Sequence, residues 1–294
     1  QIEFEFDKKL IKFEQIYCTS TPRRIVLLLD GLVDQCEDEM IIRKGPKASL
    51  AFLNGTPTKA ALGFANSLGI NVDDLEIENT EKGEFVFGKK VRKGESTRIS
   101  LSLIIPKVIK SLQGPRFMKW GNGNFKFSRP IRWLVSIYND EILDFDLDEC
   151  DPKIVVGNLS KSHRLIDRVI EINSPDNYFE ILAENGVLVK REERKEKIMN
   201  FINQSSESLN LKPALTEELL NELSDLVEFP NVITGKFDEE FLDLPVEVLS
   251  MVMKSHQRYI PLLQKSNRFS KLGLSSEQII STNFLLSLIH ISEP

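Results

Sequence analysis

Two short polar blocks contain histidines whose neighbours could take part in chemistry. His163 lies in KSHRL and is followed by Arg164, and His256 lies in KSHQRY and is followed by Gln257 and Arg258. A histidine beside basic residues can act as a general base or contact a phosphate. No carboxylate is adjacent to either histidine in the sequence, and we therefore assign no catalytic residue. These five residues remain candidates for binding an anion.

Other motifs that would predict an active site are absent from the sequence. It contains no P-loop, no GxSxG, no HExxH and no GxGxxG that opens a helix. Cys18, Cys36 and Cys150 form no CxxC pair and no cluster with zinc-ligand spacing, so we expect reduced thiols in a cytoplasmic protein and no metal site. The longest apolar runs, such as residues 25–29, are far shorter than the ~20 residues of a membrane span. We therefore expect no contact with a membrane.

The strongest charge feature is a long segment without acidic residues. Residues 96–139 contain eight Lys or Arg and no Asp or Glu, although the whole chain has a formal net charge of −6. A basic patch on an acidic protein is typical of phosphate binding. We expect its side chains to contact backbone phosphates without reading sequence. The candidates are Arg116, Lys119, Lys126, Arg129 and Arg132.

Aromatic residues are interleaved with these basic residues. Exposed rings can stack on unpaired bases, and the glycines of WGNGN (120–124) predict an exposed turn between two strands. Trp133 opens an apolar run, so we expect it in the core. The aromatic residues concerned are Phe117, Trp120, Phe125, Phe127 and Trp133.

A second charged segment offers a different explanation of the basic one. Residues 217–247 hold ten acidic residues and a single basic one, Lys236. This acidic block could neutralise the acid-free segment within one subunit, and no polyanion would then be needed. The two explanations remain open at the level of sequence.

Local patterns predict the elements that would position these residues. For the first half we expect strands at 24–29 and 83–90, a helix from Pro57 to Leu68 capped by Thr56 and ended by Gly69, and a helix at 100–112. Further on, we expect strands at 133–138 and 141–147 around an Asn139–Asp140 turn, helices at 174–186, 190–202 and 216–227, and a strand at 229–237. The charges of 190–202 indicate a solvated helix face.

Strands and helices without strict βαβ alternation predict an α+β (mixed α/β) fold in a multi-domain fragment. We expect an N-terminal region at 1–157, which contains most of the acid-free segment, and a second region at 158–285, which contains the acidic block. The last nine residues, 286–294 (LSLIHISEP), resemble the translation of a sequencing adapter. Because the chain also begins with Gln1, we expect natural sequence beyond both ends.

The order of several long blocks resembles the beta subunit of bacterial glycyl-tRNA synthetase of the tetrameric α2β2 type. The resemblance extends over residues 1 to about 265. The blocks are TSTPRRIVLLLDGL, KGPKASLAF, GTPTKAALGFANSLGI, KGEFVF, RFMKWG, FSRPIRWLV, SKSHRL, VKREERKEKI, ELSDLVEFPNVITGKFDEEFLDLPVEVL and MKSHQRYIPL.

This resemblance implies a role in ATP-dependent attachment of glycine to its tRNA. In that family the alpha subunit carries the aminoacylation centre, so ATP and Mg²⁺ are implied for the holoenzyme and no cofactor for this chain. The implied partners are glycine tRNA, the alpha subunit and a second beta subunit. Two functions then remain: tRNA handling by the basic residues, or a scaffold in which the acidic block docks on another subunit. A hydrolase built on His163 or His256 is a third and weaker alternative.

Overall fold

We describe the protein from a computed structural model. The structure describes residues 1–53, 55–81, 83–147, 149–235, 237, 239–264 and 274–281; the predicted adapter segment at 286–294 lies outside them. The chain divides into two compact units, each made of three stretches. The first unit contains Gln1–Gln15, Leu29–Pro130 and Phe145–Lys153, and the second contains Ile16–Leu28, Ile131–Asp144 and the chain from Ile154 onward. The boundary near residue 157 stays a prediction.

The described elements include helices and several small sheets, which confirms the predicted α+β class. Most of these sheets have two strands, and the pairing of β10 with β13 is parallel. None of the described helices is long and apolar enough to cross a membrane.

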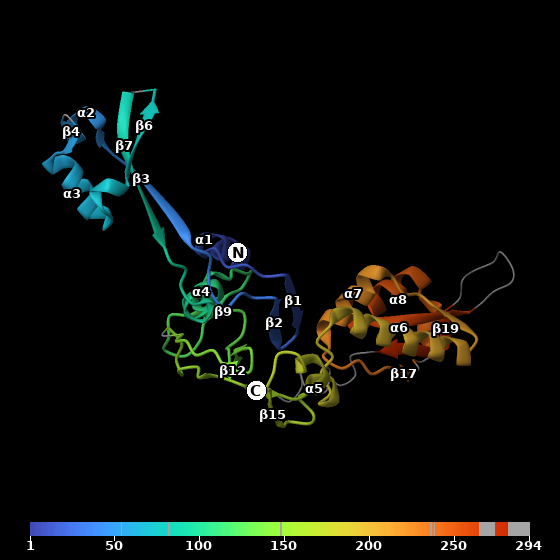
Figure 1. Cartoon of the computed structure of the whole chain (residues 1–294). Coiled ribbons are helices and arrows are strands. Elements are labelled where there is room, and N and C mark those ends of the chain that lie inside the picture. The colour runs from blue at the N-terminus through green and yellow to red at the C-terminus, as the bar shows by residue number, and fades with distance from the viewer. Residues whose placement is uncertain are drawn as a thin grey trace. The chain divides into compact units, whose positions relative to one another are not determined.

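In the first unit, a three-stranded antiparallel sheet in the order β3-β7-β6 carries helices α2 and α3 against it (Figure 1). Its core is built from small residues together with Val86, which is fully buried. The elements are β3 (Glu39–Lys47), α2 (Ala48–Ala51), β4 (Phe52–Leu53), β5 (Thr56–Pro57), α3 (Lys59–Leu68), the 3₁₀ turn Val72–Asp74, β6 (Leu75–Thr80) and β7 (Gly83–Arg92).

The cap of α3 corrects one prediction from the sequence. Thr58, not Thr56, caps the helix: its hydroxyl accepts a hydrogen bond from the Ala60 N–H. Thr56 and Pro57 instead form β5, which pairs with β4. Two candidate caps two residues apart cannot be separated by spacing alone. Gly69 ends the helix in the left-handed conformation, as expected.

The remainder of the first unit holds the acid-free segment up to Pro130. Helix α4 buries Leu101 and Ile104, and α1 contributes the fully buried Phe6. The elements are α1 (Ile2–Lys9), α4 (Thr97–Ser111), β8 (Met118–Lys119) and β9 (Lys126–Phe127).

Part of the second unit is a cluster of short strands with helix α5. Its core joins Val26 to residues more than a hundred positions later, including Ile172, Leu182 and Val187. The predicted strand at 141–147 is paired only at its start, where β11 and β12 form a hairpin around Asn139. The elements are β1 (Gln15–Thr21), β2 (Arg24–Asp30), β10 (Leu134–Val135), β11 (Ile137–Tyr138), β12 (Glu141–Ile142), β13 (Val156–Gly157), β14 (Leu159–Lys161), β15 (Val169–Glu171) and α5 (Tyr178–Glu184).

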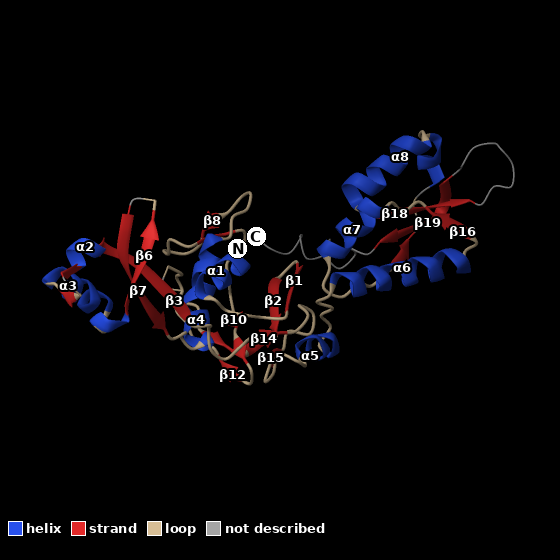
Figure 2. Ribbon diagram, turned by 45° about the horizontal axis from the view of Figure 1, so that its top comes forward, coloured by secondary structure: helices blue, strands red, loops and turns tan. Residues whose placement is uncertain are grey.

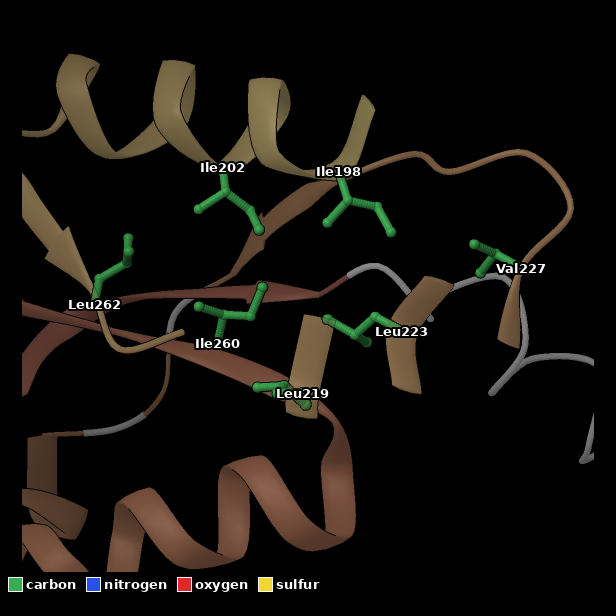
Figure 3. Close-up of a cluster of buried hydrophobic side chains, with 7 residues drawn as sticks. All are labelled: Ile198, Ile202, Leu219, Leu223, Val227, Ile260 and Leu262. Atoms are coloured by element: carbon green, nitrogen blue, oxygen red, sulfur yellow. The ribbon is translucent and has the colours of Figure 1, made fainter. Parts of the chain in front are cut away.

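The later part of the second unit packs helices α6 and α7 on a sheet with the strand order β16-β18-β19-β17 (Figure 2). Ile198 and Ile202 of α6 point toward Ile260 of β18, and Leu223 of α7 completes the cluster (Figure 3). The elements are α6 (Arg191–Ser208), β16 (Leu211–Pro213), α7 (Glu217–Leu226), β17 (Ile233–Gly235), the 3₁₀ turn Glu239–Asp243, α8 (Val246–Val252), the π-helical turn Met253–Gln257, β18 (Tyr259–Gln264) and β19 (Leu274–Ser281).

Candidate nucleic-acid interface

The acid-free segment of the first unit forms a short hairpin whose basic side chains are exposed. Strands β8 and β9 pair so that Lys119 lies directly opposite Lys126, and Met118 opposite Phe127. Residues directly opposite in an antiparallel pair share one face of the ribbon. The hairpin therefore has a cationic face and an apolar face. Arg116, Lys119, Lys126 and Arg129 are all exposed.

The aromatic rings of this hairpin contact one another. The Phe127 ring centroid lies 5.0 Å from that of Phe117 and 5.9 Å from that of Phe125. The indole N–H of Trp120 donates a hydrogen bond of 3.0 Å to the Phe127 carbonyl. These rings are half-buried and pack on the hairpin itself. Their packing fixes the ribbon that carries the lysines.

Two glycines attach the turn of the hairpin to the loop at 149–151. A Cβ at Gly121 would lie 2.0 Å from the Asp151 carbonyl oxygen, and one at Gly123 would lie 2.4 Å from that of Glu149. The Glu149 carbonyl accepts hydrogen bonds from the N–H groups of Asn124 and Phe125, at 2.9 and 3.1 Å. The predicted turn is confirmed, and its glycines serve this close approach of two backbones.

The other candidates lie in the second unit, where a buried ion pair organises the site. Arg24 Nε and Nη2 lie 2.8 and 3.3 Å from the two oxygens of Glu228, and both side chains are almost fully buried. Arg24 also donates to the Lys161 carbonyl at 3.1 Å, and Glu228 accepts from the Thr21 hydroxyl at 2.6 Å. A bidentate pair with these extra hydrogen bonds satisfies both buried charges.

Three further arginines surround this pair. Arg23 Nη1 lies 3.8 Å from a Glu228 oxygen, and its side chain is 33% exposed. Burial lowers the pKa of Arg23; Glu228 opposes this shift, and the positive charges of Arg24, Arg164 and Arg132 add to it. Arg132 and Arg164 are exposed. We call the four arginines Arg23, Arg24, Arg132 and Arg164 the arginine cluster.

Trp133 lies beside the arginine cluster and not in the apolar core that we expected. It is half-buried, and the guanidinium carbons of Arg23 and Arg24 lie 5.6 and 5.8 Å from its ring. An indole face attracts guanidinium groups because of its negative quadrupole. The ring therefore belongs to the charged site.

His163 lies next to the cluster as a neutral group. Its Nδ1 accepts a hydrogen bond from the Leu165 N–H at 3.4 Å. Burial lowers the pKa of its imidazole; Glu228 opposes this shift, and Arg23 and Arg24 add to it. A histidine that is neutral at pH 7 brings no positive charge to a phosphate site.

The second polar block, KSHQRY, lies near helix α8 and not in the arginine cluster. His256 and Gln257 are exposed in the π-helical turn, and Arg258 follows it with a φ of +56°. Arg258 Nη2 lies 2.6 Å from a Glu222 oxygen of helix α7. Its guanidinium is thus already engaged by a carboxylate.

The ion pairs of the acidic block show which basic residues that block neutralises, and so whether it neutralises the acid-free segment. Glu222 pairs with Arg258, Asp225 with Arg191, and Glu228 with Arg23 and Arg24. These partners lie outside the acid-free segment. Lys110, inside that segment, pairs with Glu149 at 3.2 Å. The ion pairs described for the acidic block therefore do not account for the excess of basic residues.

Several functional residues were missed from the sequence. Arg24 opens an apolar strand, and Glu228 lies just after the end of the acidic helix α7; the two residues are 204 positions apart. Arg194 is fully buried and donates to the carbonyls of Ser20, Leu188, Val189 and Ser224, although its helix was predicted to be a solvated face. The spacing of Arg194, Ile198 and Ile202 is the signal that places it on the buried side.

Among the residues that the structure describes, no group of three or more His, Cys, Asp or Glu could hold a metal ion. The exposed hairpin in the first unit and the arginine cluster in the second each bring several basic residues together. Exposed basic side chains of this kind are suited to contacts with phosphates.

Comparison with known proteins identifies the class of protein to which the chain belongs. Over residues 1–274 the chain matches a family of aminoacyl-tRNA synthetase subunits. That family is described as the glycyl-tRNA synthetase beta subunit, and the chain belongs to it.

Curated relatives agree with this family. The chain is 44% identical to the glycine–tRNA ligase beta subunit of Trichodesmium erythraeum over 256 residues, which are 87% of this chain and 36% of the relative. It is 40% identical to the beta subunit of Synechocystis, over 87% of this chain and 36% of the relative. It is 38% identical to that of Clostridioides difficile, over 88% of this chain and 38% of the relative. The chain thus spans somewhat more than a third of the length of these relatives.

Proposed function

We propose that this chain is a tRNA-handling part of the beta subunit of glycine–tRNA ligase and contributes to assembly of that enzyme in the cytoplasm. The alpha subunit would bind glycine, ATP and Mg²⁺ and carry the chemistry. The partners would be glycine tRNA, the alpha subunit and a second beta subunit. Membership of the beta-subunit family supports this proposal.

One observation carries the part of the proposal that concerns RNA. Lys119 and Lys126 lie directly opposite each other on an exposed face, where like charges destabilise the pairing of strands. An Nζ–Oδ1 hydrogen bond of 2.7 Å to Asn124 satisfies one donor of Lys119 but brings no negative charge. A phosphate backbone would supply that charge to both ammonium groups.

A salt titration tests this role. We would measure binding of the 294-residue chain to a glycine tRNA transcript at several salt concentrations, for the wild type and for the double variant Lys119→Gln and Lys126→Gln. The slope of log K against log salt should decrease in magnitude by about 0.7–0.9 for each phosphate that the variant no longer neutralises. Arg129→Ala, in the same unit as the hairpin, should likewise weaken binding and flatten the slope.

The matched control is the double variant Lys59→Gln and Lys93→Gln, which removes the same charge from exposed positions of the same unit. It should leave affinity and slope close to those of the wild type. Equal effects of the two double variants would mean that only the net charge matters, and a folded chain that binds no tRNA would refute the proposal.

A second candidate function, subunit docking, is favoured by an exposed apolar face on α8. Val248, Met251 and Val252 lie at helical spacing and are 44%, 56% and 40% exposed. Exposed apolar stripes of this kind mark interaction surfaces. If this face docks on the alpha subunit or on a second beta subunit, Val248→Asp should abolish co-purification with that partner and leave tRNA binding unchanged.

A further inference from the structure

Arg24 and Arg23 share the Glu228 carboxylate unequally. Both Glu228 oxygens are already engaged by Arg24, at 2.8 and 3.3 Å, and one of them also accepts from Thr21. Arg23 lies 3.8 Å from the nearer oxygen, which is beyond hydrogen-bond distance. Glu228 therefore compensates Arg24 and leaves Arg23 only weakly compensated.

The geometry leaves the weakly compensated Arg23 accessible to a ligand. The Arg23 side chain is 33% exposed, whereas that of Arg24 is 4% exposed. Arg132 is exposed and directly precedes Trp133, whose ring lies 5.6 Å from the Arg23 guanidinium. Burial lowers the pKa of Arg23; Glu228 opposes this shift, and the positive charges of Arg24, Arg164 and Arg132 add to it. An anion beside the Trp133 ring would meet the Arg23 guanidinium and the positive charge of the neighbouring Arg132.

We infer that Arg23 and Arg132, beside Trp133, form a second binding site for the phosphodiester backbone of an RNA strand, separate from the hairpin. The inference rests on the proposed function and assigns Arg23 and Trp133 to a site with the predicted candidate Arg132. The buried Arg24–Glu228 pair acts as a positioning element: it fixes β2 at Arg24 and thereby orients the neighbouring Arg23.

A phosphate strand fits this site better than a carboxylate of a partner protein. Guanidinium groups bind phosphate oxygens in a bidentate manner, and successive phosphates of one strand can reach separate arginines. The indole of Trp133 can in addition stack on an unpaired base. A carboxylate could pair with the arginines but could not stack on the indole.

The test compares single substitutions in the 294-residue chain, with a glycine tRNA transcript as the probe. Arg23→Gln and Arg132→Gln should each weaken binding and reduce the magnitude of the salt slope by about 1. Arg23→Lys keeps the charge and should retain the slope of the wild type. The control is Arg168→Gln, which removes one exposed arginine from the segment that follows His163 and should change neither quantity.

Each outcome decides between the explanations. If the wild type binds tRNA and only the hairpin variants weaken binding, this inference is wrong and the proposed function stands. If the wild type binds no tRNA, both fail. If Arg23→Gln does not fold, Arg132→Gln decides alone, because its side chain is exposed. If Arg132→Gln leaves tRNA binding intact but abolishes co-elution with the alpha subunit, the site binds a protein carboxylate and the inference is overturned.

Discussion

At the scale of single residues, the second unit depends on arginines that the fold removes from water. Arg24 is compensated by a carboxylate and Arg194 by four backbone carbonyls. A buried cation that loses its partner keeps the cost of desolvation. Substitutions of the partners should therefore have larger effects than substitutions of exposed charges.

Glu228→Gln tests this dependence. The variant removes the charge that compensates Arg24 but keeps a similar volume, and we expect a loss of about 3–5 kcal/mol in the free energy of unfolding. Glu196→Gln, on the exposed face of α6, should change it by less than about 0.5 kcal/mol. Urea unfolding followed by circular dichroism measures both. A loss at Glu228 no larger than that at Glu196 would show that the pair does not stabilise the fold.

His163 should titrate below its ordinary pKa of 6.5. Its pKa is lowered in the folded state, so the unfolded chain binds the proton more readily. Stability from this residue is therefore lost as the pH falls through 6.5 toward the folded pKa, and is unaffected well above 6.5. NMR titration of the imidazole measures the midpoint, and Arg23→Gln should raise it because one positive charge is removed. A midpoint at or above 6.5 in the wild type would contradict the assignment.

At the scale of elements, most helices could be predicted because their signals are local. The helix predicted at 216–227 is present as α7, which buries Leu219 and Leu223 and is capped by Thr216. The strand at 229–237 was predicted too long: among its described residues, those that pair are Ile233–Gly235 of β17. The pairing of Arg24 with Glu228 could not be predicted, because it depends on how distant segments pack. The hairpin was predictable as a turn, but its attachment to residues 149–151 was not.

The glycines of the hairpin provide a test of that attachment. Gly123→Ala should place a methyl group 2.4 Å from the Glu149 carbonyl oxygen and force the turn away from it. We expect faster hydrogen exchange at the amides of Asn124 and Phe125, which donate to that oxygen. Gly63→Ala is the control, since nothing lies within 4 Å of the added methyl group in α3. Gly63→Ala should stabilise the protein by about 0.5–1 kcal/mol. Unchanged hydrogen exchange at Asn124 and Phe125 in Gly123→Ala would refute the attachment.

At the scale of the whole molecule, each unit is assembled from three separate stretches of chain. The predicted boundary at residue 157 would leave the strands of 16–28 and 131–144 on the opposite side from the rest of the second unit. Composition shifts along the sequence do not reveal such interleaving, because the acid-free segment at 96–139 itself runs from the first unit into the second. Family membership was predictable, in contrast, because many blocks occur in a fixed order.

A truncated chain tests this interleaving. Residues 158–294 alone lack Val26, Val135 and Ile137, which pack with Ile170 and Ile172. We therefore expect rapid hydrogen exchange at 170–172 but continued protection at 198–202, whose core lies within the truncated chain. Exchange rates at 170–172 equal to those of the intact chain would show that this packing is dispensable.

The long separation between Arg24 and Glu228 has a consequence for synthesis on the ribosome. Arg24 emerges 204 residues before the carboxylate that compensates it, and Val26 emerges long before the helix and strands that cover it. The nascent strand must therefore stay hydrated and exposed until the second half of this chain has been translated. Contacts of such high sequence separation form slowly and leave apolar segments open to aggregation in the meantime. Ile25 and Leu27, which remain exposed even in the finished fold, add to the surface that a chaperone would bind during that interval.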